Sequence, residues 1–135
     1  MTTKFLTPAD LSEDFIVAPD KKVHCANSNG GKSTRVYACA FRGSTTTGSG
    51  VDEGWRRRLT LSGNLGIIHL DFKRTTTNTG IVATLPPAAP TPIDALAVQT
   101  WDGGEVIIYG NSRDVRCSGL SANRRYVIDL VGFFQ

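Results

Sequence analysis

A tryptophan followed by an aspartate and two glycines, Trp101-Asp102-Gly103-Gly104, is the segment whose residue types best suit ligand binding. An exposed indole ring can cover the apolar face of a pyranose, and a neighbouring carboxylate can accept hydrogen bonds from sugar hydroxyls. The sequence therefore makes Trp101 the candidate stacking ring and Asp102 the candidate hydroxyl acceptor of a carbohydrate site. The competing interpretation is that Trp101 caps the core at a strand end, and Tyr109 has the same two interpretations.

Further candidates for this site lie earlier in the chain. His69 and Asp71 are two residues apart in an alternating segment, so their side chains are neighbours on one strand face. The two side chains form either a solvated polar pair or a catalytic dyad. We include His69, Asp71 and Trp55 as candidate carbohydrate contacts. Arg56 is the first residue of the basic run Arg56–Arg58 and is the candidate partner for an anionic group of the ligand. The alternative is that this run forms a solvated strand face.

Signatures of enzymes are few. Neither G-x-S-x-G nor H-E-x-x-H occurs. Gly31-Lys32-Ser33 matches the end of a P-loop, but Ala26 stands where its first glycine belongs, and a strand rather than a helix is expected to follow. We therefore expect a protein that is not an enzyme and needs no cofactor. The alternative is a glycosidase that uses two carboxylates, whose separation the sequence does not give. The carboxylates available for it are Asp52, Glu53, Asp71, Asp102 and Glu105.

The three cysteines do not predict a metal site. Cys25, Cys39 and Cys117 form no C-x-x-C pair and no zinc-finger spacing with His24 or His69. An odd number of cysteines without an export signal indicates reduced, mostly buried thiols. A disulfide between Cys25 and Cys39 is the alternative.

Length and composition predict one globular domain. The chain has 135 residues, 40% of them hydrophobic and 20% charged, with a formal net charge of +3. Domains run at roughly 100–200 residues, so we expect a single β-sandwich domain over 1–135, with a helix and lead-in segment over 1–20. No apolar run reaches the roughly 18–20 residues of a membrane helix, and the N-terminus lacks the order of a signal peptide. We expect no membrane insertion, and so small a charge excess does not indicate nucleic-acid binding.

Hydrophobic alternation and glycine-rich turns predict an all-β fold, an antiparallel sandwich or barrel of about nine strands. One short helix is expected near residues 8–14, where Pro8 follows a threonine cap. Gly43–Gly50 is expected to be a polar loop, and the prolines from Pro86 to Pro92 a stiff surface connection. The expected strands are Val23–Ala26, Val36–Phe41, Trp55–Leu61, Leu65–Lys73, Ile81–Leu85, Asp94–Thr100, Glu105–Tyr109, Asp114–Cys117 and Arg125–Phe134.

Two of these strands carry clear facial patterns. In the strand from Leu65 to Lys73, one face should point into the core, namely Gly66, Ile68, Leu70 and Phe72. In the last strand both faces are largely apolar, with Tyr126, Ile128, Leu130 and Phe134 on one and Val127, Asp129, Val131 and Phe133 on the other. A second partner surface is therefore needed, either in a symmetric oligomer or from a loop of the same chain.

The segment from Ala83 to Gln135, about the last two fifths of the chain, resembles the C-terminal head domains of receptor-binding proteins in bacteriophage tail fibres and baseplates, particularly of siphophages of Gram-positive hosts. The resemblance rests on the order of its pieces: Leu85-Pro86 with Pro90 and Pro92, a strand reaching Trp101, then the segments 103–108, 114–120 and 125–134. Such heads are antiparallel β-sandwiches or barrels that form trimers and bind cell-surface saccharides.

The resemblance implies an adhesion domain that recognises a host cell-wall polysaccharide during adsorption. It implies a homotrimer on a larger tail or baseplate component of the virion, assembled in the host cytoplasm. The alternatives are a cell-wall polysaccharide depolymerase and a tail or capsid decoration protein without a ligand. The sequence before Leu61 does not match the pattern of these heads.

Overall fold

A computed structural model of the chain describes residues 15–17, 23–25 and 34–135. Its contacts divide the chain into two units, Met1–Thr34 and Arg35–Gln135, and each is described by itself. In the first unit, β1 (Phe15–Val17) pairs antiparallel with β2 (Val23–Cys25), and Ile16 lies opposite His24. The helix expected near residues 8–14 lies outside the described residues, whereas the strand expected from Val23 is present as β2.

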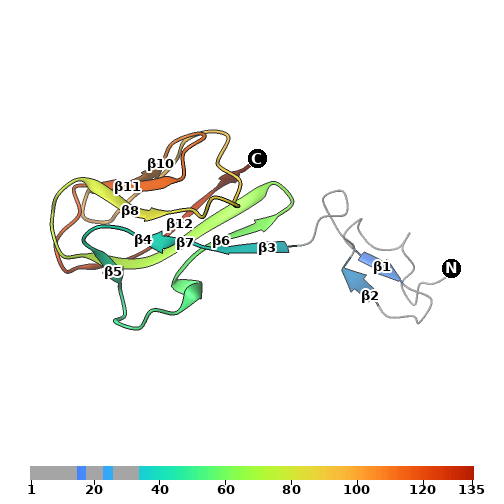
Figure 1. The fold of residues 1–135 in the computed structure, drawn as a ribbon, viewed down its shortest axis with the longest axis horizontal. Coiled ribbons are helices and arrows are strands. Elements are labelled where there is room, and N and C mark those ends of the chain that lie inside the picture. Colours follow the sequence, from blue (N-terminus) through green and yellow to red (C-terminus); the bar gives the residue numbers. More distant parts are fainter. Residues whose placement is uncertain (1–14, 18–22, 26–33) are drawn as a thin grey trace. The chain divides into compact units, whose positions relative to one another are not determined.

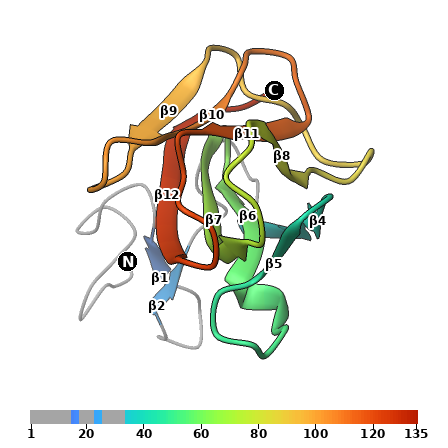
Figure 2. The ribbon, with the colours of Figure 1, turned by 90° about the vertical axis from the view of Figure 1, so that its left-hand side faces the viewer.

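The second unit consists of two antiparallel sheets (Figures 1 and 2). The first sheet has the order β12-β7-β6-β3, and β5 also pairs with β7. The second sheet has the order β4-β8-β11-β10-β9. The first sheet contains β3 (Thr34–Ala38), β5 (Thr45–Thr47), β6 (Arg57–Ser62), β7 (Leu65–Arg74) and β12 (Arg125–Phe133). The second contains β4 (Ala40–Phe41), β8 (Gly80–Thr84), β9 (Leu96–Gln99), β10 (Glu105–Ile108) and β11 (Asp114–Ser118). The predicted all-β class is confirmed.

The core lies between these sheets and follows the alternation of β7. The four residues predicted to face inward, Gly66, Ile68, Leu70 and Phe72, are all buried. In β12 the inward face is the predicted one, and Tyr126, Leu130 and Phe134 are each 2% exposed or less. The second sheet supplies the opposite wall of the core through Val82, Ala83, Val106, Ile108, Val115 and Cys117.

Gly66 is required by close packing. A Cβ atom at this position would lie 2.6 Å from Cδ1 of Phe134 and 2.9 Å from Cδ2 of Leu61. Such distances are well inside van der Waals contact, so any side chain here would displace the Phe134 ring. The glycine lets the end of the chain pack directly on β7.

Three local expectations are corrected by the structure. The loop expected over Gly43–Gly50 contains β5, which pairs with the far end of β7, although it has no apolar pattern. Trp55 lies in a 3₁₀ turn, η1 (Gly54–Arg56), and the strand begins after it at Arg57. The connection over 86–92 is not wholly on the surface, because Ala89 and Pro92 are buried.

Both described thiols match the prediction of reduced, buried cysteines. Cys39 and Cys117 are free and only 1% and 2% exposed. Burial raises the pKa of Cys39 to about 12 and raises that of Cys117 as well. The alternative disulfide to Cys25 involves a side chain that lies outside the described part of the chain.

The segment that leads into β9 passes from one sheet to the other. Thr91 and Gln135 exchange backbone hydrogen bonds, and the Ile93 amide donates to the Phe133 carbonyl, so this segment first borders the end of β12. From Leu96 onward it pairs with β10 instead. The strands β9 and β12 therefore diverge from a closed corner, and each is the end strand of its sheet.

The outer face of β12 is open in the single chain. Val127, Val131 and Phe133 are 54–62% exposed, so no loop of the described residues covers them. Across the strand register, Val131 lies opposite Ile67 and Phe133 opposite Leu65, and both partners are also exposed. These five side chains lie on the outer face of the first sheet, and we refer to them as the apolar stripe. The paired His69 and Asp129 lie between Val127 and the other four. Among the described residues, no helix has the length and apolar character required to cross a membrane.

Candidate functional site

Trp101 lies at the tip of the β9–β10 hairpin and is the most exposed large apolar side chain of the described residues. Its exposed fraction is 74%. The interpretation that it caps the core is therefore wrong. The guanidinium of Arg124 lies 4.7 Å from the centre of the ring, a cation–π contact of modest strength at an exposed site. The ring remains available to a ligand.

Asp102, in contrast, is occupied by groups of the protein. Its carboxylate accepts hydrogen bonds from the Thr100 hydroxyl at 2.5 Å, the Tyr126 hydroxyl at 2.6 Å and the Ser121 hydroxyl at 3.2 Å. These bonds, that from Thr100 first, lower the pKa of Asp102 to about 2. The Tyr126 hydroxyl also accepts a bond from the Ser121 amide. Asp102 thus ties the hairpin to the segment before β12 and positions Trp101, rather than serving as a free acceptor for sugar hydroxyls.

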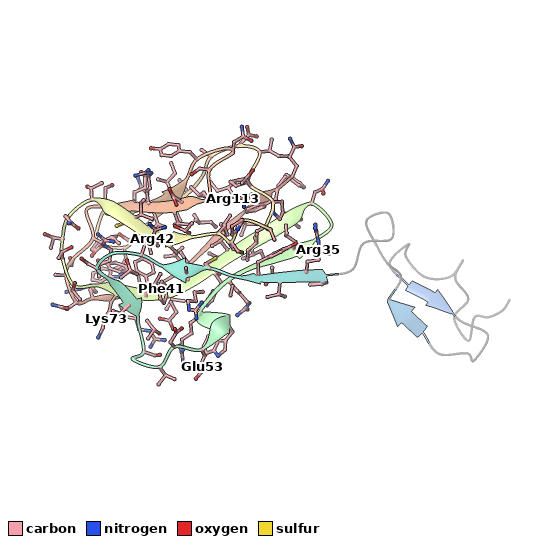
Figure 3. All side chains as sticks on the ribbon, in the orientation of Figure 1. Arg35, Phe41, Arg42, Glu53, Lys73 and Arg113 are labelled. Atoms are coloured by element: carbon pink, nitrogen blue, oxygen red, sulfur yellow. The ribbon has the colours of Figure 1, made fainter. Side chains whose placement is uncertain are left out.

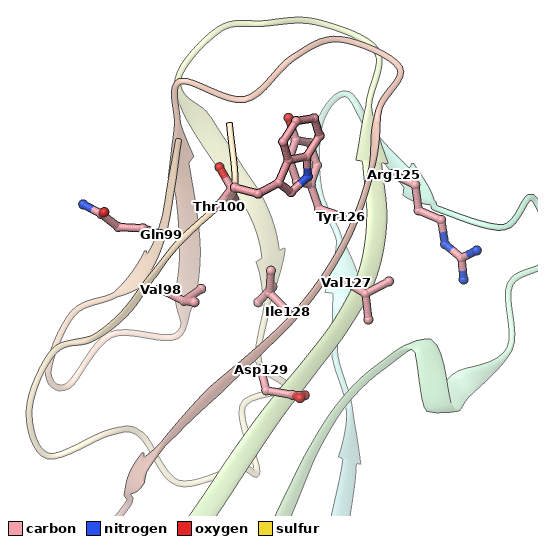
Figure 4. A pocket seen from close by; sticks show the side chains of 9 residues that line it. Val98, Gln99, Thr100, Arg125, Tyr126, Val127, Ile128 and Asp129 are labelled. Carbon is pink, nitrogen blue, oxygen red and sulfur yellow. The ribbon is translucent and has the colours of Figure 1, made fainter. Parts of the chain in front are cut away.

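A groove of about 240 Å³ lies beside Trp101, between the diverging strands β9 and β12. Figure 4 shows Val98 and Ile128 facing each other across it, and they give the groove an apolar floor. Gln99 and Arg125 also border the groove, but in the same view their side chains extend away from it on opposite sides. Its polar contacts must therefore come largely from backbone groups.

The backbone edge of β12 supplies such groups. Phe133 and Gln135 bond to the segment before β9, which shows that odd-numbered residues turn their backbone groups away from β7. Val127 and Asp129 follow the same alternation and border the groove. Within the described part of the chain, no strand pairs with this edge of β12. Their amide and carbonyl groups are the donors and acceptors that a polyhydroxylated ligand needs.

The second tryptophan is built into an internal stack. Arg56 places its guanidinium 4.1 Å from the centre of the Trp55 ring, and the His69 ring stacks on the indole at 6.3 Å between centres. The indole N–H donates to the Glu53 carboxylate. Trp55 is 47% exposed, so it offers a ligand less free surface than Trp101.

Arg56 and Asp71 belong to an ion-pair network. Asp71 is 1% exposed and accepts hydrogen bonds from Arg125 at 2.8 and 2.6 Å and from Arg56 at 2.5 Å. These arginines, Arg125 first, hold the pKa of Asp71 below its usual range despite its burial. A Cβ at Gly48 would lie 2.3 Å from the Asp71 carboxylate, so this glycine makes room for the network. The prediction of a solvated Asp71 is wrong, and Arg56 is already paired with a carboxylate.

His69 bonds to a carboxylate other than Asp71. Its Nδ1 lies 2.7 Å from Oδ1 of Asp129 on the neighbouring strand. The pair borders a shallow hollow of about 310 Å³ with Arg58, Thr60 and Ile67. Asp129 was missed as a partner because only the register between β7 and β12 brings it opposite His69.

The candidate residues thus fall into two places. Trp101 borders the groove and Asp102 follows it in the same turn. Trp55, Arg56, His69 and Asp71 are instead joined by contacts around the outer face of β7. No family model, curated protein or solved structure matches the chain.

The remaining candidate carboxylates are dispersed among local contacts. Asp52 pairs with Arg57, Glu53 accepts from Trp55, and Asp71 and Asp102 are held as described above. Among the described residues, no group of three or more His, Cys, Asp or Glu side chains could hold a metal ion. The groove at Trp101 is the arrangement best suited to binding.

Proposed function

We propose that the protein is a non-enzymatic adhesion domain of a bacteriophage tail, and that it binds a host cell-wall polysaccharide in the groove at Trp101. The observation that carries this proposal is the 74% exposed indole ring beside a groove bordered by an edge of β12 with which no described strand pairs. The ring covers the apolar face of one pyranose, and the backbone groups of Val127 and Asp129 exchange hydrogen bonds with hydroxyls of the next. The resemblance of residues 83–135 to phage head domains supports the same function, because that segment contains both β9 and β12.

We further propose that three copies assemble through the apolar stripe of Leu65, Ile67, Val127, Val131 and Phe133. Burial of exposed apolar surface stabilises association by about 25 cal/mol per Å² before the costs of ordering are subtracted. Clustered apolar side chains exposed on a sheet face form a surface that monomers rarely expose. Thr60 and Ser62 lie opposite Ile67 and Leu65 on β6 and provide a polar border.

Trimerisation also compensates for weak individual sites. Shallow saccharide sites bind at about millimolar to micromolar Kd, because hydroxyls exchange bonds with water for bonds with protein at little net gain. Several linked sites raise the overall affinity through effective concentration. In this proposal the trimer docks on a larger tail or baseplate component of the virion after assembly in the host cytoplasm.

The test is retention of purified host-wall polysaccharide by the full chain and by Trp101→Ala. Loss of the stacking ring is expected to weaken retention at least about tenfold, equivalent to roughly 1.4 kcal/mol. Tyr109→Ala is the matched control, because Tyr109 is 52% exposed and lies outside the groove. Equal retention by both variants, with unchanged melting temperatures, would remove Trp101 from the site.

A further inference from the structure

A second hollow is lined by basic and hydroxyl side chains. It encloses about 400 Å³ where the β4–β5 turn approaches the end of β7 and the start of β8. Its polar lining consists of Arg42, Ser44, Arg74, Asn78 and Thr79, with no carboxylate. We refer to it as the basic hollow. It shares no lining residue with the groove at Trp101.

Arg74 is a buried cation held only by neutral groups. It is 3% exposed and donates to the Thr45 hydroxyl at 3.0 Å, the Ile81 carbonyl at 3.0 Å and the Asn78 amide oxygen at 2.7 Å. Its Nε has no partner. A guanidinium stays charged at all ordinary pH values, and a buried charge without a counter-ion is costly.

The other buried network of the second unit shows what Arg74 lacks. Arg56 and Arg125 share the carboxylate of Asp71, so each guanidinium in that network has a charged partner. Among the described residues, no carboxylate forms an ion pair with Arg74 or with Arg42. The positive charge at the basic hollow is therefore available to an external anion.

The remaining side chains of the basic hollow suit the same ligand. Arg42 is exposed and donates to the Thr84 hydroxyl at 2.9 Å, which leaves other N–H groups of its guanidinium free. That hydroxyl in turn donates to Asp114, so the Asp114 carboxylate is linked to Arg42 through Thr84. The hydroxyls of Ser44 and Thr79 form no hydrogen bond within the described part of the chain. They are donors available to a bound oxyanion.

We propose that the basic hollow binds a phosphate group, either free or as a diester in a polyol-phosphate polymer. Arginine forks match the geometry of phosphate oxygens, and their hydrogen bonds to phosphate are charge-assisted. Donors from the turn at Ser44 and from the loop at Thr79 approach from different elements, which suits a tetrahedral anion better than a planar carboxylate. The partly buried charge of Arg74 is screened less than a surface charge, so it attracts the anion more strongly.

The test follows backbone amide signals of the full chain by NMR during titration with inorganic phosphate at constant ionic strength. Saturable shifts are expected at Gly43, Ser44, Thr79 and Gly80. Arg42→Ala is expected to weaken binding about tenfold or more, and Ser44→Ala by less. The control is Lys73→Ala, which removes one positive charge on the opposite face of β7 from Arg74. Figure 3 marks Arg42 and Lys73 on the ribbon.

A parallel titration with poly(glycerol phosphate) distinguishes the two sources of the phosphate. Shifts of the same amides at lower phosphate concentration identify the polymer as the ligand, whereas shifts with inorganic phosphate alone identify the free ion. The absence of saturable shifts with both probes would overturn the proposal. Equal weakening in Arg42→Ala and Lys73→Ala would also overturn it, because it would indicate non-specific attraction. These results do not depend on Trp101, so this proposal and the saccharide groove can fail separately.

Discussion

The two tryptophans of the chain have similar neighbours but different environments. Each has an arginine over its ring, Arg124 at Trp101 and Arg56 at Trp55. At Trp55 the arginine is tied to the buried Asp71, and His69 stacks on the indole as well. At Trp101 the side-chain hydrogen bonds to Asp102 are made beside the indole ring and do not include it.

The exposure of each indole ring therefore depends on whether the ring itself takes part in the neighbouring polar contacts. The Trp55 ring is part of a network of contacts that stabilises the sheet. The Trp101 ring instead projects from a turn that is held in place by hydrogen bonds to Asp102. We therefore assign Trp55 to stability and Trp101 to binding.

Asp71→Asn is expected to lower the free energy of unfolding by about 3 kcal/mol. The substitution leaves Arg56 without a charged partner, and the Nε of that arginine is already buried without a hydrogen bond. Urea denaturation measures the change. The control is Asp52→Asn, which breaks the more exposed pair with Arg57 and should cost about 1 kcal/mol or less. Equal losses in the two variants would show that the Asp71 network contributes no more than a surface ion pair.

Trp55→Ala and Trp101→Ala are expected to separate stability from binding. Removal of the Trp55 ring should lower the free energy of unfolding by about 1–2 kcal/mol through the lost contacts with Arg56 and His69. Removal of the Trp101 ring should change stability by about 0.5 kcal/mol or less, since the ring is mostly exposed. Chemical denaturation and polysaccharide retention, measured on both variants, test the assignment. A retention loss confined to Trp55→Ala would reverse it.

Acid should weaken the interactions that the carboxylates of Asp71 and Asp102 make near the two tryptophans. The folded pKa values of Asp71 and Asp102 lie below those of free carboxyls, so their stabilisation is fully present above about pH 4 and is lost as the pH falls further. For Asp102 the loss extends down to about pH 2. Tyr126→Phe removes one donor to Asp102 and should make the fall in stability between pH 4 and 2 shallower. Thermal melting across this range measures the slope, and an unchanged slope would mean that the Tyr126 bond does not stabilise the charged carboxylate.

Sequence patterns predicted the features that depend on alternation. The inward residues of β7 and β12 were identified because buried and exposed positions alternate along a strand. The strand β5 was missed because its Gly, Ser and Thr residues have no such pattern, and its pairing with β7 is made by the backbone.

The site residues were harder to predict because their roles depend on distant partners. The Asp71 carboxylate accepts a hydrogen bond from Arg125, which is 54 positions away in sequence, and the Asp102 carboxylate accepts one from Tyr126. Neither contact follows from local spacing. The exposure of Trp101 likewise depends on how the hairpin turns away from the core, so the residue type alone left both interpretations open.

The most direct test of the proposed function is a fluorescence titration of Trp55→Phe, in which Trp101 is the sole remaining tryptophan of the two. Host-wall polysaccharide is added to the folded full-length variant, and the indole emission is followed to saturation. A saturable shift in Trp101 emission, with the same midpoint as polysaccharide retention, is the predicted result. Retention without any change in emission would contradict the account, because the sugar would then bind away from the ring.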